Sequence, residues 1–188
     1  MKHLIYLHGF KSSPSSHKAV CLQKAIENRS DVIFSAPQLH GEPQVVLQQL
    51  LDNLSHLRND NIYLIGSSLG GYFATYLSEQ FNFPATLVNP AINPYDFDTL
   101  IGEHTHPETG ESFAVTAAHL QQFRQFDVKT ITQPRNFLLL LKTGDEVLDY
   151  RLALEKFPQA KHIIQSGGNH IFENFDQMIP DIFDFFKF

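Results

Sequence analysis

Three polar side chains that lie far apart in the sequence have the types needed for nucleophilic catalysis. The first, Ser68, stands in the pattern Gly66-x-Ser68-x-Gly70, after a short apolar run and before a helical one. This strand–turn–helix context is typical of a nucleophile elbow, a sharp turn whose flanking residues must lack side chains. Such a turn exposes the serine oxygen beside the first N–H groups of a helix, which stabilise negative charge. The alternative interpretation is a glycine- and serine-rich turn without chemistry.

A serine hydroxyl is a weak nucleophile, so an imidazole must take its proton and a carboxylate must orient that imidazole. His170 follows the last predicted strand and two glycines, in a loop able to carry its ring to Ser68. Asp145 is the first carboxylate after the strand predicted at 136–141, and Glu146 and Asp149 are its alternatives. We expect Asp149 to cap the next helix and Glu146 to face solvent. The hypothesis is therefore a triad of Ser68, Asp145 and His170.

Acyl transfer also requires two N–H donors for the negatively charged oxygen of the intermediate. The residue after the nucleophile, Leu69, is expected to supply one backbone N–H. The second is expected from Phe10, in the turn His8-Gly9-Phe10 that follows the first predicted strand. We interpret His8 as a packed turn residue with no part in proton transfer.

Alternating strands and helices are what would bring these residues together. Apolar runs predict strands near 3–7, 31–36, 61–65, 85–88, 136–141 and 161–164, and helices fall between them. This alternation predicts an α/β fold of three layers, with about six mainly parallel strands and helices on both faces. Sites in open parallel sheets lie beyond the carboxyl ends of the strands, where all of the candidate residues fall. The aromatic stripe near the C-terminus is expected to pack in the core.

The segment 91–134 departs from this alternation. It is polar and interrupted, only residues 113–126 have a helical pattern, and we expect no strand in it. A connection of this length is unusual in a compact domain. We therefore interpret residues 1–188 as one domain, with 91–134 as a lid or cap beside the site. A surface excursion with no role in binding is the alternative.

Composition argues against several other classes of function. The net charge is −6 and basic residues are scattered, so neither nucleic acid nor an anionic membrane surface is an expected partner. Cys21 is the single cysteine, and the first apolar run is too short for a signal peptide or a membrane span. We therefore expect a cytoplasmic location. His104-x-His106 lacks the further ligands of a metal site, so no metal is expected.

Several segments together resemble the α/β-hydrolase superfamily, and nearly the whole chain looks like the small bacterial YqiA-like esterases. The resemblance implies a serine esterase that acts on acyl esters without a cofactor, and it leaves acyl thioesters open. It also implies that Ser68 is the nucleophile, Asp145 the acid and His170 the base. A peptidase or thioesterase with the same triad, or a small-molecule-binding protein without turnover, remains the alternative. The matching segments are Tyr6–Phe10, Gly66–Tyr72, Asn89–Ala91, Thr143–Tyr150 and Gly167–His170.

Overall fold

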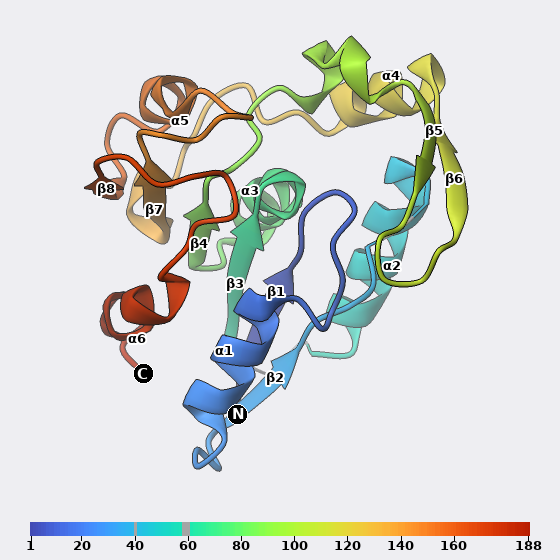
Figure 1. The fold of residues 1–188 in the computed structure, drawn as a ribbon. Coiled ribbons are helices and arrows are strands. Elements are labelled where there is room, and N and C mark those ends of the chain that lie inside the picture. Colours follow the sequence, from blue (N-terminus) through green and yellow to red (C-terminus); the bar gives the residue numbers. More distant parts are fainter. Residues whose placement is uncertain (40, 58–60) are drawn as a thin grey trace.

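The computed structural model describes residues 1–39, 41–57 and 61–188, and a sheet of six strands runs through its centre (Figure 1). All neighbouring strands in this sheet are parallel, in the order β2-β1-β3-β4-β7-β8. The expected α/β architecture with six parallel strands is therefore confirmed. The strands are β1 (Lys2–Leu7), β2 (Val32–Ser35), β3 (Asn61–Ser67), β4 (Ala85–Val88), β7 (Phe137–Lys142) and β8 (Lys161–Gln165).

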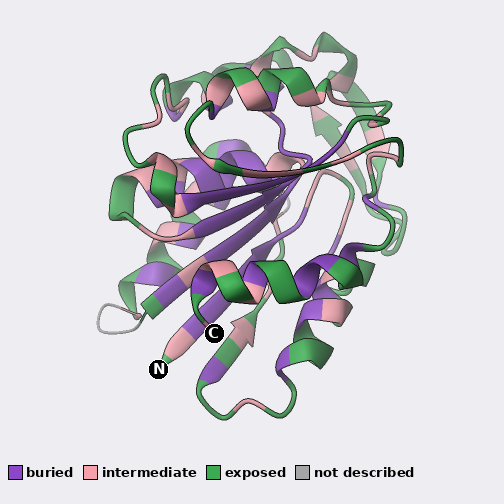
Figure 2. Cartoon of the chain, turned by 90° about the vertical axis from the view of Figure 1, so that its left-hand side faces the viewer, coloured by how far each residue is buried: buried purple, intermediate pink, exposed green. Residues whose placement is uncertain are grey.

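Helices cover both faces of the sheet, as crossovers between parallel strands require. One face carries α1 (His17–Ile26) and α6 (Ile179–Phe186), and the other carries α2 (Pro43–Ser55), α3 (Leu69–Phe81) and α5 (Tyr150–Lys156). Figure 2 shows the strands buried along much of their length and the helices exposed on their outer sides. The middle layer is thus shielded from water, which explains why strands such as β7 are apolar almost throughout.

The four inner strands, β1, β3, β4 and β7, each contribute to two separate hydrophobic clusters, because successive side chains of a strand point to opposite faces. In β1, Leu4 and Tyr6 pack in the cluster with α1 and α6, whereas Ile5 and Leu7 pack in the cluster with α2 and α3. The C-terminal apolar stripe enters the first of these clusters, and its expected role in core packing is confirmed. Its buried members are Phe172, Phe175, Ile179, Ile182 and Phe186.

The segment 91–134 contains two strands, and the expectation that it has none was wrong. Strands β5 (Gly102–Thr105) and β6 (Ser112–Val115) form a separate antiparallel pair, followed by α4 (Ala117–Gln125). Most residues of the two strands are exposed or half-buried, so they lack the apolar run by which a core strand is recognised. Three short 3₁₀ turns complete the segment, at Pro94–Asp96, Asp98–Leu100 and Pro134–Asn136.

The expected helix in this segment is present, and Thr116 sets its start. The Thr116 hydroxyl accepts a hydrogen bond from the backbone N–H of His119, and the His119 ring accepts one from the N–H of Thr116. This reciprocal capping ends the strand at Val115 and begins α4 at Ala117, later than the helical pattern alone indicates. In Figure 1 the β5–β6 pair and α4 lie together beyond one end of α2.

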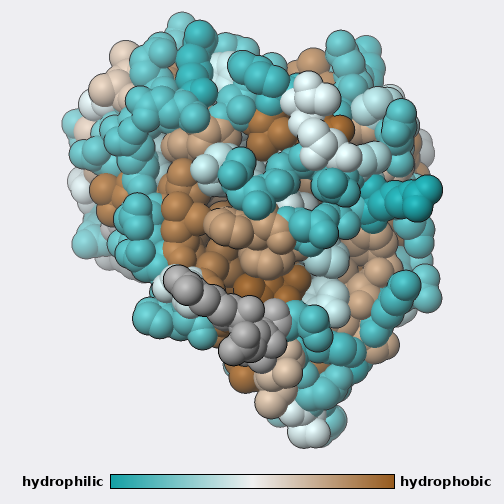
Figure 3. Space-filling model, turned by 180° about the vertical axis from the view of Figure 1, so that it is seen from behind, coloured by the Kyte–Doolittle hydropathy of each residue, from teal (hydrophilic) through white to brown (hydrophobic). Residues whose placement is uncertain are grey.

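Apolar side chains also gather on the outside of the molecule. Figure 3, which views the molecule from behind, shows them in a hollow of that face. A cavity of about 360 Å³ lies between α2 and the sheet, where Leu50, Leu54 and Leu57 face Ile5 and Leu64. None of the helices within the described residues is both long and apolar enough to cross a membrane.

Candidate active site

The turn between β3 and α3 holds Ser68 in an unusual backbone conformation. Ser68 has φ of 53° and ψ of −121°, whereas the residues on either side belong to the strand and the helix. A positive φ in a residue other than glycine costs about 1–3 kcal/mol and persists only where the surroundings impose it. The Ser68 N–H donates to the carbonyl of Val88 (3.0 Å), and its own carbonyl accepts from Gly71 and Ala91 (2.9 and 3.0 Å). Backbone bonds on both sides thus hold the conformation.

The two glycines of the pattern are required by close approach of backbone. A Cβ on Gly66 would lie 2.4 Å from the carbonyl oxygen of Gly70, and a Cβ on Gly70 would lie 2.0 Å from that of Leu7. Real Cβ atoms do not come so near to backbone, so no side chain fits at either position. The geometry therefore agrees with the interpretation of Gly66-x-Ser68-x-Gly70 as a nucleophile elbow.

The structure brings Ser68, His170 and Asp145 together from three separate strand ends. Nε2 of His170 lies 3.0 Å from Oγ of Ser68. Nδ1 of the same ring lies 2.9 and 3.0 Å from the two carboxylate oxygens of Asp145. A carboxylate can only accept, so Nδ1 carries the hydrogen and Nε2 is left as the acceptor for the Ser68 hydroxyl. The three groups form one chain of hydrogen bonds.

The carboxylate in this chain is shielded from water, since only 2% of the Asp145 side chain is exposed. Burial raises the pKa of the Asp145 carboxyl, but hydrogen bonds from His170, Leu148 and Val147 outweigh burial and hold that pKa below its ordinary value. The N–H groups of Val147 and Leu148 donate to Oδ1 at 2.9 and 2.8 Å. Asp145 therefore remains a carboxylate, the form that can accept the imidazole N–H.

The two alternatives for the acid are occupied elsewhere. The Asp149 side chain caps α5 by accepting from the N–H of Arg151 (2.9 Å), as expected. Glu146 is exposed, but its carboxylate accepts from the backbone N–H of His170 at 2.9 Å. Glu146 therefore holds the loop that carries the imidazole, a contact that the sequence analysis missed because the two residues are 24 positions apart.

A second residue that sequence reasoning missed is Asn89, which directly follows β4. The residue is 3% exposed, and its side-chain amide nitrogen donates to the carbonyls of Asn169 and His170 (3.2 and 3.1 Å). Its amide oxygen accepts from the backbone N–H of Lys142 at 2.9 Å. Asn89 thus ties the imidazole loop to the ends of β4 and β7. Its position after a buried strand was the available signal, although it could not reveal these partners.

The turn after β1 lies directly against Ser68. A Cβ on Gly9 would be 3.6 Å from Oγ of Ser68. Leu39 donates its N–H to Nε2 of His8 (3.0 Å), so the hydrogen of this ring is on Nδ1, 2.9 Å from the Gly9 carbonyl. His8 is 1% exposed and holds the turn, in agreement with its interpretation as a packed residue. Leu69 begins α3, so its N–H has no acceptor within the helix.

Two cavities meet at this turn. The first, which we call the serine cleft, has a volume of about 470 Å³ and is lined by Ser68 and His170 among others. The second, which we call the apolar chamber, has a volume of about 230 Å³ and reaches Leu69. Gly9 and Phe10 line both. The chamber is otherwise walled largely by side chains from α2, α3 and the segment 91–134, which include Val46, Phe73, Leu100, Phe113, Val115 and Phe123.

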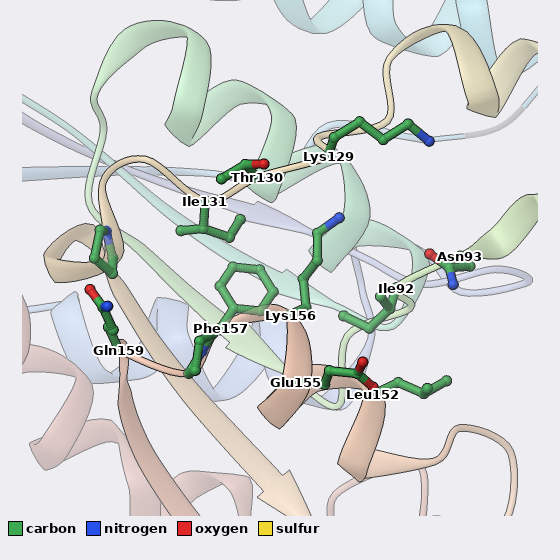
Figure 4. A pocket seen from close by; sticks show the side chains of 12 residues that line it. Ile92, Asn93, Lys129, Thr130, Ile131, Leu152, Glu155, Lys156, Phe157 and Gln159 are labelled. Atoms are coloured by element: carbon green, nitrogen blue, oxygen red, sulfur yellow. The ribbon is translucent and has the colours of Figure 1, made fainter.

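A third cavity, of about 540 Å³, lies away from the three hydrogen-bonded residues. Figure 4 shows Lys156 and Phe157, at the end of α5, pointing toward the segment that carries Lys129 and Ile131. The Lys156 ammonium donates to the carbonyl of Val128 within this region. Neither Ser68 nor His170 lines this cavity.

Two histidines of the segment 91–134 form hydrogen bonds with backbone carbonyls through their ring nitrogens. Nε2 of His104 lies 2.7 Å from the carbonyl of Leu100, and Nε2 of His106 lies 3.0 Å from that of Ser12. Among the described residues, no group of three or more His, Cys, Asp or Glu side chains is arranged to hold a metal ion.

Comparison with solved structures identifies the fold. The chain is similar to Est1E of Butyrivibrio proteoclasticus, solved with ferulic acid bound, with a TM-score of 0.75 at 14% identity, covering 100% of this chain and 88% of that one. It also matches the mouse alpha/beta hydrolase domain-containing protein 10, with a TM-score of 0.74 at 17% identity and coverage of 97% and 89%. The chain therefore has the α/β-hydrolase fold, as the resemblance implied.

Comparison of sequences identifies the family. A UPF0227 protein of Citrobacter koseri is 30% identical over 175 residues, which span 91% of each chain. The family described as uncharacterised protein family UPF0227 matches residues 3–187. This match does not name the YqiA-like esterases, so the narrower resemblance is not shown by it. The chain belongs to the UPF0227 family and has an α/β-hydrolase fold.

Proposed function

We propose that this protein is a serine esterase that hydrolyses small carboxylic esters through Ser68, His170 and Asp145. The observation that carries the proposal is the unbroken chain of hydrogen bonds from the Asp145 carboxylate through both ring nitrogens of His170 to the Ser68 hydroxyl. This arrangement lies at a strained turn and beside the first N–H groups of a helix. Each of these features serves acyl transfer, and their combination favours that chemistry over a structural role.

The first step is attack on the ester carbonyl. Nε2 of His170 accepts the proton of Ser68 while Oγ bonds to the carbonyl carbon, and Asp145 stabilises the imidazolium that forms. The backbone N–H groups of Leu69 and Phe10 stabilise the oxyanion, and such a donor contributes about 3–4 kcal/mol in the transition state. The imidazolium then protonates the leaving alcohol, which departs and leaves an acyl group on Oγ.

The second step repeats the proton transfers with water. Nε2 accepts a proton from a water molecule, whose oxygen attacks the acyl carbon, and the imidazolium returns that proton to Oγ as the acid leaves. An acyl thioester could enter the same sequence with a thiol as leaving group. The YqiA-like resemblance, and an α/β-hydrolase neighbour that binds a carboxylic acid, agree with an ester substrate.

The test compares the wild type with Ser68→Ala in hydrolysis of p-nitrophenyl butyrate and in covalent labelling by a fluorophosphonate. We expect Ser68→Ala to lower kcat by at least about 10⁴-fold and to abolish labelling, with an unchanged circular dichroism spectrum. Ser55→Ala is the matched control, because Ser55 is exposed and its hydroxyl donates to the carbonyl of Asp52 within the same helix (2.7 Å). It should retain wild-type activity.

The result also separates the rival functions. A folded wild type that neither reacts with the fluorophosphonate nor hydrolyses any ester would refute the proposal and favour a binding protein on this scaffold. Labelling without ester hydrolysis would instead favour another acyl-transfer reaction, such as peptide or thioester cleavage, through the same serine.

A further inference from the structure

The apolar chamber has no part in the hydrogen-bonded chain described above, although it begins beside it. Leu69, Gly9 and Phe10 line the end of the chamber that is nearest to Ser68. From there the chamber extends beneath the segment 91–134. The serine cleft contains Ser68 and His170, whereas the chamber is lined by neither. Two distinct compartments therefore adjoin the position where the oxyanion would form.

The chemistry of the proposed reaction assigns one group of the substrate to each compartment. The leaving alcohol must receive its proton from Nε2 of His170, so it must lie on the side of His170. That side is the serine cleft. With the carbonyl oxygen held between the N–H groups of Leu69 and Phe10, the remaining substituent, the acyl chain, points toward the chamber.

The walls of the chamber suit an uncharged chain. Phe10, Phe73, Phe113 and Phe123 all contribute to its lining. The ring of Phe113 stands edge-on to that of Phe10, with centroids 5.7 Å apart, so the β5–β6 pair closes the chamber over the turn.

The two histidines nearest this turn have ring nitrogens bonded to the backbone. His8 contacts Leu39 and Gly9, and His106 contacts Ser12 through Nε2. Nδ1 of His106 accepts from the N–H groups of Glu108 and Thr109, both at 3.3 Å. These rings hold loops in place. Lys11, Glu42 and His119 also line the chamber, but the Lys11 ammonium lies over the Phe10 ring (5.7 Å to the centroid), the Glu42 carboxylate accepts from the Gln122 amide (3.2 Å), and Nδ1 of His119 accepts from the N–H of Thr116. These charged and polar side chains of the lining thus have partners within the protein, and the apolar side chains supply the contacts for a substrate chain.

The volume of the chamber limits the length of that chain. At roughly 30 Å³ for a group of the size of water, about 230 Å³ holds seven or eight such groups. We propose that the chamber is the acyl-binding subsite and that it selects uncharged acyl groups of about four to eight carbons. Phe113 is the specificity-determining residue of this subsite. The inference rests on the proposed esterase function and adds the class of acyl group to it.

The experiment measures kcat/KM for p-nitrophenyl esters with acyl chains from two to twelve carbons. For the wild type, each added methylene should raise kcat/KM by about fourfold up to about six carbons, since each leaves water for the chamber. Beyond about eight carbons kcat/KM should fall. Phe113→Ala should move the optimum toward longer chains, and Val115→Phe should move it toward shorter ones. Both residues are half-buried, so neither change empties the core.

Two controls complete the design. Ile101→Ala removes an exposed apolar side chain from the same segment outside the chamber, and it should keep the wild-type chain-length profile. A series of acetates with lengthening alcohols tests the other side of the ester. Phe113→Ala should leave the profile of that series unchanged, because the alcohol occupies the serine cleft.

The outcomes separate this inference from the proposed function. A wild type that hydrolyses no ester would refute the esterase function itself. An active wild type with a flat acyl profile would overturn only the subsite assignment. The assignment would fail equally if Phe113→Ala left the acyl profile unchanged, or if it altered the profile of the alcohol series instead.

Discussion

Replacing Asn89 should release the loop that carries His170 while leaving Ser68 and Asp145 in place. Asn89 is 3% exposed and its side chain makes three hydrogen bonds, two to loop carbonyls and one to the end of β7. A hydrogen bond of this kind contributes about 1 kcal/mol net, and more where a buried partner is left unsatisfied. The three together predict a loss of about 3 kcal/mol in the free energy of unfolding.

Asn89 has φ of 40°, so a substitution changes stability both by removing hydrogen bonds and by changing the cost of this backbone conformation. Two substitutions distinguish these effects. Asn89→Gly tolerates this φ but makes the unfolded chain more flexible, whereas Asn89→Ala is strained in the folded state; each effect is about 1 kcal/mol. Both variants lose the same three hydrogen bonds. We therefore expect similar losses of stability in urea unfolding, with kcat for p-nitrophenyl butyrate reduced about 10- to 100-fold and KM little changed, because a 1 Å misplacement of a catalytic group has a cost of this size.

Asn82→Gly is the matched control for these measurements. Asn82 also has a left-handed backbone, with φ of 59°, but it is exposed, and its side-chain oxygen accepts a hydrogen bond from the exposed amide of Asn136 (2.7 Å). We expect it to lose less than about 1 kcal/mol and to keep wild-type kcat. If the Asn89 variants are no less stable than Asn82→Gly, or lose stability while keeping full kcat, the role assigned to Asn89 is wrong.

Three further predictions concern the elbow and the acid. Gly70→Ala should prevent folding or lower the free energy of unfolding by more than about 4 kcal/mol, because its Cβ would meet the Leu7 carbonyl at 2.0 Å; a melting temperature near that of the wild type would contradict this. Asp145→Asn should lower kcat by about 10⁴-fold, by analogy with serine proteases, whereas Asp149→Asn should retain activity, and equal losses would reopen the choice of acid. The lowered pKa of Asp145 means that its carboxylate stabilises the fold above its ordinary unfolded value of about 4, and that this contribution disappears as the pH falls through the lower folded value. The stability of the wild type relative to Asp145→Asn, from urea unfolding, should therefore be constant above about pH 5 and decrease as the pH falls below that value, and a difference that stays constant at lower pH would argue against this role.

The sequence by itself determined the sheet, the elbow and the candidate residues. Apolar runs that alternate with helical patterns have one stable arrangement, a parallel sheet covered on both faces, and the rule that sites lie beyond the strand ends then selects Ser68, Asp145 and His170. The prediction of the sheet succeeded because it depends on local patterns, and Ser68, Asp145 and His170 are the candidates that the same patterns select. The sequence also indicates why positions 66 and 70 are glycine, since so tight a turn has no room for a side chain at either position.

Only the tertiary structure decided which groups contact one another when their residues lie far apart in the sequence. The bonds from Glu146 and Asn89 to the His170 loop join residues 24 to 81 positions apart, and no periodicity encodes them. The short, partly exposed strands β5 and β6 have no apolar run. The sequence therefore did not predict that they form a wall of the apolar chamber. Long-range hydrogen bonds and cavity shape arise when separate elements meet, which is why the spacing of residues along the chain does not reveal them.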